Sequence, residues 1–288
     1  MASSLYSKHL NNKKALYLRT TVLVTILGIF AVISLFPLAY MFTWSFGPAV
    51  DTASTSYSLL PSKWTFDSYK YFVDYSPYSL TWLWNSLVVA TCTVIGNVIF
   101  AGMAGYAFAK INFRGRKWLF YLVLMSMMIP YQVTQVPLYI LFVSKFKMTN
   151  TFAGLILPGV CSTYNIFLSK QFFSGIPTAL IESAKIEGCG HIRIYRLIVL
   201  PLSKTILAVM AINTFLGSWN NFFWPFLVTS SDAMYTIQVG LKTFKFANGT
   251  LLSPMLAGAC ISAIPMFILF FSLQKYFLEG VTVGAVKG

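Results

Sequence analysis

Charged residues are scarce in this chain of 288 residues. Only 10% of its residues are Asp, Glu, Lys or Arg, whereas a soluble domain averages about 25%. Hydrophobic residues make up 57% of the chain, and its mean hydropathy is +0.70. We therefore expect most of the chain to lie in lipid or in a membrane-buried bundle.

Motifs for hydrolysis, nucleotide binding and metal binding are also absent. The chain contains no GxxxxGKS or GxxxxGKT, no HExxH and no GxSxG, and its four cysteines show no CxxC spacing. No charged residue lies in the middle of a predicted span, where ion-coupled carriers usually need one. These absences argue against a self-powered carrier and an intramembrane hydrolase. We expect no catalytic residue and no metal here, and uphill transport would need energy from another subunit.

Six uncharged stretches are long enough to cross a bilayer, which takes about 20 mainly apolar residues per helix. Membrane-spanning helices are predicted near residues 20–45, 83–108, 118–143, 152–170, 205–228 and 255–276. Pro158 and Gly159 interrupt the fourth, a break that neighbouring helices or polar side chains can accommodate. The predicted fold is therefore an all-α polytopic membrane protein with six transmembrane helices.

Basic residues are distributed unevenly between the two sides of these spans. Fifteen of the 21 Lys and Arg residues lie before the first span, after the second, after the fourth or after the last. Since cytoplasmic loops are enriched in Lys and Arg, both termini are expected in the cytoplasm. Segments 46–80, 145–151 and 229–252 are then expected outside. The same bias explains the net charge of +14 without binding to nucleic acid.

The polar segment 171–204 predicts a short helix from Thr178 to Glu187, followed by a second, basic helix. Ala184 and Gly188 are small and would leave one edge flat enough to fit a groove on another protein. Glu182 lies near the helix start and could pair with a cation of that partner. An ordinary amphipathic loop on the membrane surface explains the same pattern.

One set of residues in this segment resembles the EAA motif of ABC importer permeases, whose pattern is E-A-A-x3-G-x9-I-x-L-P. The matching residues are Glu182, Ser183, Ala184, Gly188, Ile198, Leu200 and Pro201. The one departure is Ser183, a small residue in place of an alanine. Segments 105–116, 128–130, 219–225 and 276–288 are similar to the MalG-type carbohydrate family. The resemblance covers about residues 80–288 and implies the ABC type I importer permease (MetI-like) fold.

This resemblance also implies a domain organisation. Residues 1–81 would form an N-terminal cytoplasmic segment, the first transmembrane helix and an outer loop. Residues 82–279 would form a five-helix permease core that includes the EAA loop 171–204. Residues 280–288 would form a C-terminal cytoplasmic tail.

Several partners are implied as well. A second, MalF-like permease would complete the translocation pathway, two ABC ATPase subunits would lie beneath it, and an extracytoplasmic solute-binding protein would deliver the solute. ATP and Mg would be bound on the ATPases, so this chain would be no enzyme and would hold no cofactor. Glu182, Ser183, Ala184, Gly188 and Pro201 would form the ATPase-coupling element, with Glu182 pairing with an ATPase arginine. The location would be the cytoplasmic (inner) membrane of a bacterium.

Two further segments acquire expected roles from the resemblance. Gly284, Lys287 and Gly288 would reach the ATPase interface, although a disordered end is the usual state of a terminus. The tip of the loop 229–252, formed by Asn248, Gly249 and Thr250, would enter the binding protein. Asn-Gly is a turn signal by its own chemistry, so a plain surface turn explains this tip equally well.

The solute pathway is predicted at Trp219, Asn220, Asn221 and Trp224 on the fifth span. Amide and indole groups suit sugar hydroxyls and rings, but they also join helices in lipid. The expected function is import of a carbohydrate, such as a di- or oligosaccharide. Import of a glycerol phosphodiester, glycerol phosphate or another polar solute is the alternative within transport. A membrane scaffold or sensor is the alternative from another class.

Overall fold

The computed structural model describes residues 2–49, 60–246 and 249–285, and the side chains of 16–49, 60–245 and 251–275. The predictions at Asn248, Lys287 and Gly288 therefore lie outside the described residues. The chain divides into two compact units, Met1–Phe72 with Ala247–Cys260, and Val73–Phe246 with Ile261–Gly288.

The first unit contains α1 (Ala2–Ser45), most of α2 (Asp67–Asp74) and the first turns of α15 (Leu252–Ala285). The apolar part of α1, Leu16–Ser45, has a mean hydropathy of 2.6 and is long enough to cross a membrane. This agrees with the first predicted span. The Phe46 ring contacts those of Phe66 and Tyr69, with centroids 5.4 Å and 5.2 Å away. These contacts fix the segment that follows α1 against α2.

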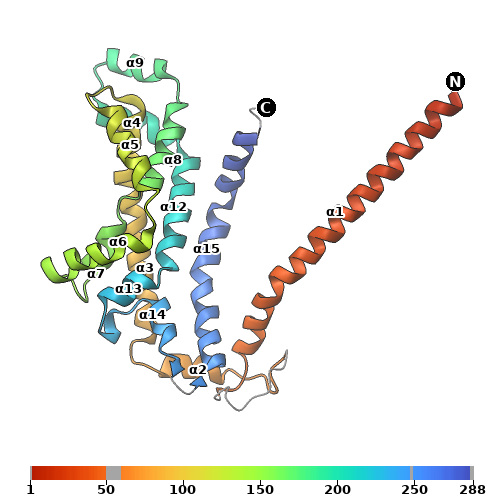
Figure 1. Cartoon of the computed structure of the whole chain (residues 1–288), viewed down its shortest axis with the longest axis vertical. Coiled ribbons are helices and arrows are strands. Elements are labelled where there is room, and N and C mark those ends of the chain that lie inside the picture. Colours follow the sequence, from red (N-terminus) through yellow and green to blue (C-terminus); the bar gives the residue numbers. More distant parts are fainter. Residues whose placement is uncertain (1, 50–59, 247–248, 286–288) are drawn as a thin grey trace. The chain divides into compact units, whose positions relative to one another are not determined.

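The second unit is built on one long span, Ser79–Lys110, which consists of α3 (Ser79–Gly96), the π-helical turn η2 (Asn97–Ala101) and α4 (Gly102–Lys110). Helix α8 (Thr163–Ser174) packs along α4, and α12 (Lys204–Trp219) packs along α3 (Figure 1). Gly105 lets α8 approach closely, because a Cβ there would collide with Ser169. The second predicted span is therefore confirmed, and the small residue at position 105 permits close packing of α4 and α8.

Three of the predicted spans are bent or broken. The third consists of α5 (Arg116–Ser126), followed by α6 (Tyr131–Tyr139) and η3 (Ile140–Lys145) at an angle of 97°. A continuous helix over 118–143 was therefore wrong. Pro130, which precedes α6, has no N–H to continue α5. The fourth bends by 42° after α7 (Phe152–Ile156) and η4 (Leu157–Gly159), which confirms the predicted break at Pro158 and Gly159.

The fifth predicted span, 205–228, is also divided. Helix α12 ends at Trp219, and a short helix α13 (Phe223–Val228) follows. On its other side, α10 (His191–Ile194), η5 (Tyr195–Val199) and α11 (Leu200–Leu202) join α12 at a bend of 84°. Within the described residues, three helices are long and apolar enough to cross a membrane, or up to six if each bent pair is one span.

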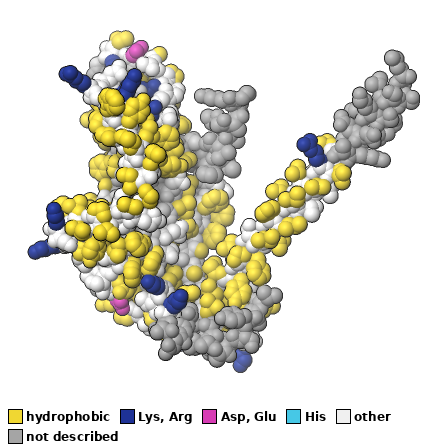
Figure 2. Space-filling model, viewed as in Figure 1, with side chains coloured by type: hydrophobic (Ala, Val, Ile, Leu, Met, Phe, Trp, Pro, Cys, Tyr) yellow, Lys and Arg dark blue, Asp and Glu magenta, His cyan; other side chains and the backbone are white. Residues whose placement is uncertain are grey.

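The two ends of the second unit differ. Helix α9 (Thr178–Ile186) lies at one end, and α13 and α14 (Ile237–Lys242) lie at the other (Figure 1). At the α14 end, Trp82 Nε1 donates to the carbonyl of Asp232 in η6 (Asp232–Met234) over 2.8 Å, and Asn85 Nδ2 donates to that of Ala233. The strands β1 (Lys245–Phe246) and β2 (Gly249–Thr250) flank residues 247 and 248. Hydrophobic side chains cover much of the visible flank of this bundle (Figure 2).

Candidate functional site

Helix α9 packs one face onto the core of the second unit. Ile181 and Ala184 are 2% and 5% exposed and belong to a cluster with Ile194 and Val199. The methyl group of Ala184 therefore points inward. The prediction of a flat exposed edge at Ala184 was wrong, because the basic segment after α9 folds back beneath it.

The opposite face of α9 is exposed. It carries Glu182, Ser183, Lys185 and Ile186, all exposed. Ile186 is 88% exposed, which is unusual for an aliphatic side chain at the end of a polar helix. Sequence reasoning missed Ile186, although an isolated aliphatic residue between Lys185 and Glu187 was a visible signal.

Gly188 ends α9 for a conformational reason. Its φ of +79° lies in the left-handed region, and its N–H donates to the carbonyl of Lys185 over 3.0 Å. A Cβ at this position would meet no atom within 4 Å in this chain. The backbone alone therefore requires glycine here, whatever else contacts it.

The loop that contains α9 is fastened to the end of α4 at two places. Lys110 Nζ donates to the carbonyls of Ile176 and Ser174, the latter over 3.5 Å. The Tyr106 hydroxyl lies 3.2 Å from Nδ1 of His191, which follows α9 in the same loop. These contacts connect the loop to the long span that ends in α4. Pro201, in α11, precedes the 84° bend into α12.

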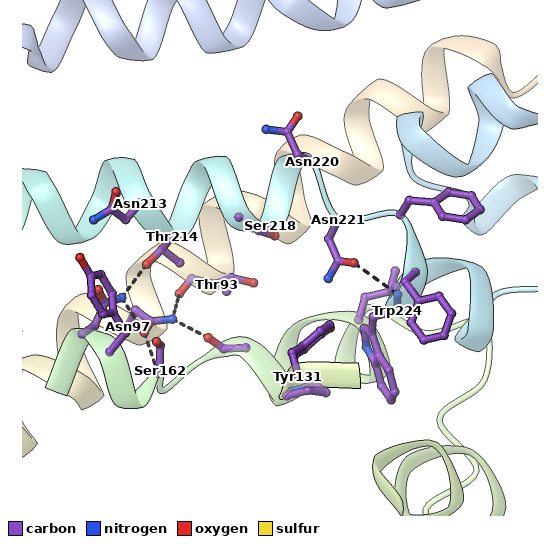
Figure 3. A pocket seen from close by; sticks show the side chains of 18 of the residues that line it. Thr93, Asn97, Tyr131, Ser162, Asn213, Thr214, Ser218, Asn220, Asn221 and Trp224 are labelled. Carbon is purple, nitrogen blue, oxygen red and sulfur yellow. Dashed lines mark hydrogen bonds between the residues drawn. The ribbon is translucent and has the colours of Figure 1, made fainter. Parts of the chain in front are cut away.

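A polar cavity of about 620 Å³ lies between α3, α6, α8, α12 and α13 (Figure 3). No lining residue is charged. Its hydroxyl and amide side chains are those of Thr93, Asn97, Tyr131, Ser162, Tyr164, Asn165, Asn213, Thr214, Ser218, Asn220 and Asn221. Such a lining can exchange hydrogen bonds with a neutral polar molecule without the cost of burying a charge. Among the described residues, no cluster of His, Cys, Asp or Glu could hold a metal ion.

Asn97 organises one wall of this cavity. Its Nδ2 donates to the carbonyls of Thr93 and Gly159, and its Oδ1 accepts from the backbone N–H of Ser162 over 2.8 Å. The side chain therefore bridges the π-helical turn η2 and the break at Pro158 and Gly159. Breaks in spans persist where side chains satisfy the freed backbone groups in this way.

Asn165 extends this network to α12. Its Nδ2 donates to Asn97 Oδ1 over 3.0 Å and to Thr214 Oγ1 over 2.8 Å. Asn165 is 2% exposed, and its Oδ1 has no hydrogen-bond partner. The wall of the cavity thus keeps one unsatisfied acceptor, to which a hydroxyl group could donate.

The four predicted pathway residues separate into two groups. Asn220, Asn221 and Trp224 line the cavity, whereas Trp219 does not. Trp219 is buried, and its Nε1 donates to the carbonyl of Ser262 in α15 over 3.2 Å. Trp224 Nε1 donates to the carbonyl of Gly154 over 3.0 Å. Both indole N–H groups therefore join helices. Asn221 Oδ1 accepts from the backbone N–H of Trp224 over 3.3 Å, so the Asn220 amide and Asn221 Nδ2 are the amide groups left for a solute.

Sequence reasoning missed further lining residues on α12. Asn213, Gly217 and Asn220 recur at intervals of four and three residues, so they share one face of the helix. A Cβ at Gly217 would meet nothing within 4 Å, which shows that this face is open. Helical spacing of polar residues within an uncharged span was the signal that could have found them.

The remaining predicted positions are only partly described. Gly249 and Thr250 form β2. Gly284 lies within α15, which continues to Ala285, so the helix extends into the segment predicted as a tail.

Comparison with known proteins places this geometry among transport permeases. Residues 97–283 match the model of the family described as "binding-protein-dependent transport system inner membrane component". The chain is 37% identical over 260 residues to the arabinooligosaccharides transport system permease protein AraQ of Halalkalibacterium halodurans, which covers 90% of this chain and 93% of that protein. It is 33% identical over 268 residues to the sn-glycerol-3-phosphate transport system permease protein UgpE of Brucella abortus, with coverages of 90% and 93%.

A solved structure is similar in fold. A bacterial ABC transporter involved in the import of the acidic polysaccharide alginate contains a chain that superimposes with a TM-score of 0.78. The superposition covers 89% of this chain and 95% of that one, at 24% sequence identity. The similarity establishes the helical arrangement.

Proposed function

This chain belongs to the family of binding-protein-dependent transport system inner membrane components, and we propose that it passes a neutral oligosaccharide through its polar cavity. The uncharged lining carries this proposal. Amides and hydroxyls pair with sugar hydroxyls, and the exposed ring of Tyr131 offers a face for a sugar ring. Similarity to AraQ supports the same solute class.

A phosphorylated polyol is the second candidate, and similarity to UgpE favours it. Recognition of a phosphate group commonly uses Arg or Lys. Neither lines this cavity. A phosphorylated solute would therefore depend on cations from another subunit, and we rank it second.

The partners follow from the family and from the two ends of the bundle. We propose that a second permease completes the pathway, and that one of two ATPase subunits docks at α9 through its exposed face. A solute-binding protein would dock at the opposite end, where α13 and α14 lie. Since most basic residues lie at the ends of spans on the α9 side, both termini would be cytoplasmic. ATP hydrolysis would take place on the ATPases alone.

One experiment tests the function directly. The permease is co-purified with its partner subunits and reconstituted in proteoliposomes. ATP is enclosed in the vesicles, where it reaches the ATPases that face the lumen, and the binding protein is added outside. We expect ATP-dependent accumulation of a labelled oligosaccharide from a panel and none of labelled sn-glycerol-3-phosphate. Accumulation of sn-glycerol-3-phosphate without any oligosaccharide would show that the phosphorylated polyol is the solute. Failure of any ATPase to co-purify would contradict the transport mechanism.

A further inference from the structure

We propose that a second site, separate from the polar cavity, binds an anionic phospholipid between α4 and the segment α10–η5. The inference does not depend on which solute the permease passes. It rests on an apolar cavity, on a basic hollow that adjoins it, and on a buried residue with an unpaired hydroxyl group in the wall of the apolar cavity.

The apolar cavity has a volume of about 410 Å³ and lies between the end of the long span and the segment after α9. Val98, Ile99 and Met103 form one wall, and Ile192 and Leu200 contribute to the other. Ile99 and Met103 are each 45% exposed, so the cavity opens at the surface of a membrane-spanning helix. In that environment an acyl chain is the solvent that fills an apolar opening.

The basic hollow continues from the apolar cavity. Its lining includes Arg193, Arg196 and His191, and the last two also line the apolar cavity. Both arginines are exposed, and within the described residues neither forms an ion pair. No Asp or Glu lines either opening. A guanidinium group matches a phosphate with two parallel hydrogen bonds, and basic pockets at the ends of membrane helices bind anionic headgroups.

Tyr195 supplies a third observation. The residue lines the apolar cavity, is 7% exposed, and its hydroxyl group has no hydrogen-bond partner. Buried hydroxyl groups are normally paired. An ester oxygen between the acyl chain and the phosphate of a phospholipid would provide the missing acceptor. An acyl chain in the apolar cavity and a phosphate at the arginines would place the ester oxygens near the wall that Tyr195 helps to form.

Such a lipid would hold α10–η5 against α4. That segment is continuous with α9, because Cys189 N donates to the carbonyl of Ala184 over 2.9 Å and Ile194 N donates to that of Gly190 over 3.1 Å. The lipid would therefore stabilise the position of α9 relative to the long span. The acyl chains of the lipid give no preference for this cavity over the surrounding bilayer. Selectivity for an anionic headgroup must therefore come from the arginines.

The test compares lipid retention by the complete transporter, purified with its partner subunits. Native mass spectrometry measures the lipid bound after incubation with phosphatidylglycerol or with phosphatidylcholine of the same acyl chains. We expect phosphatidylglycerol to be retained about tenfold better. R193Q/R196Q should abolish this preference, and M103W should reduce retention of both lipids by filling the apolar cavity. R114Q/K117Q, which neutralises two exposed cations at the same end but outside both openings, should behave as the wild type.

A second measurement needs no variant. A phosphatidylglycerol with a photoreactive diazirine on its acyl chain is irradiated with the wild-type complex, and labelled peptides are identified. Labelling of residues 98–111 and 191–200 supports the proposal. Equal retention of the two lipids, or labelling that avoids both segments, would overturn it. Labelling in the isolated permease that disappears in the complete complex would assign the openings to a partner subunit instead.

Discussion

Asn165 donates a hydrogen bond from its side-chain amide to Oδ1 of Asn97, over 3.0 Å. Since Asn97 also binds the carbonyl of Gly159, and Asn165 also binds Thr214, this pair joins the long span, the broken span and α12. The wall of the polar cavity is thus held by two buried amides. Both amides are buried, at 1% and 2% exposure, so a lost partner would leave a buried polar group unpaired, and the network should be important for both shape and stability.

The first prediction concerns this pair. Asn97→Leu keeps the branched shape of the side chain but leaves the Ser162 N–H and the Asn165 amide without their acceptor. Removing one partner of a buried hydrogen bond costs about 1–3 kcal/mol per unsatisfied group. We expect a clear fall in the midpoint of thermal unfolding of the detergent-purified protein. Ser174→Ala, which removes an exposed hydroxyl that bonds only within its own helix, is the matched control. An unchanged midpoint for Asn97→Leu would show that the network is dispensable.

The second prediction separates the solute contacts from helix contacts on α12. Asn213 lines the cavity, whereas Trp219 is turned toward α15. Asn213→Leu should reduce the uptake rate about three- to tenfold, the equivalent of one hydrogen bond of about 0.5–1.5 kcal/mol. Trp219→Phe should retain uptake and lose only stability. Uptake of labelled oligosaccharide, normalised to the amount of protein in the membrane, measures both. If Trp219→Phe reduced uptake and Asn213→Leu did not, the solute pathway would lie at Trp219.

The positions of the spans and one of their breaks could be predicted from the sequence. Apolar stretches located the spans, and Pro158 with Gly159 located one break, because these residues act on their own backbone. The bend before Pro130 and the end of α12 at Trp219 were not predicted. Hydropathy averages over side chains and contains no information about the direction of the backbone.

The candidate sites show the same limit. Trp219 and Trp224 have the same composition signal, but their orientations depend on Ser262 and Gly154, which are distant in sequence. Ala184 matched a motif correctly, yet its burial depends on how the following segment folds beneath α9. Asn213 could have been predicted from the sequence, because the spacing of polar residues along one helix is enough to identify it.

The third prediction concerns docking at α9. Ile186 is the large apolar side chain on the exposed face of this helix, and Glu182 precedes it by one turn. Ile186→Asp should prevent co-purification of the ATPase and abolish uptake, because an apolar anchor at the centre of an interface typically contributes about 2 kcal/mol or more. Ile186→Val should preserve both. If Ile186→Asp retains the ATPase and transports normally, α9 docks through another face.

The fourth prediction decides why residue 188 is glycine. Gly188 and Gly190 are exposed, and a Cβ at either would meet nothing within 4 Å in this chain. They differ in backbone conformation, with φ of +79° at Gly188 and −73° at Gly190. Alanine in the left-handed region costs about 1–2 kcal/mol. Gly188→Ala should therefore destabilise the end of α9, measured by faster hydrogen exchange of its amides, whereas Gly190→Ala should not.

Gly188→Asn distinguishes the conformational explanation from close contact with an ATPase. Asparagine tolerates the left-handed conformation better than alanine, although its side chain is larger. If the backbone alone requires glycine, Gly188→Asn should recover more transport than Gly188→Ala. If a partner surface approaches residue 188, the larger side chain should be the worse of the two.

The double variant Glu182→Ala with Gly188→Trp removes the charge and blocks any approach, so it should abolish uptake while the protein remains in the membrane. Normal uptake by that variant would exclude α9 as the coupling element.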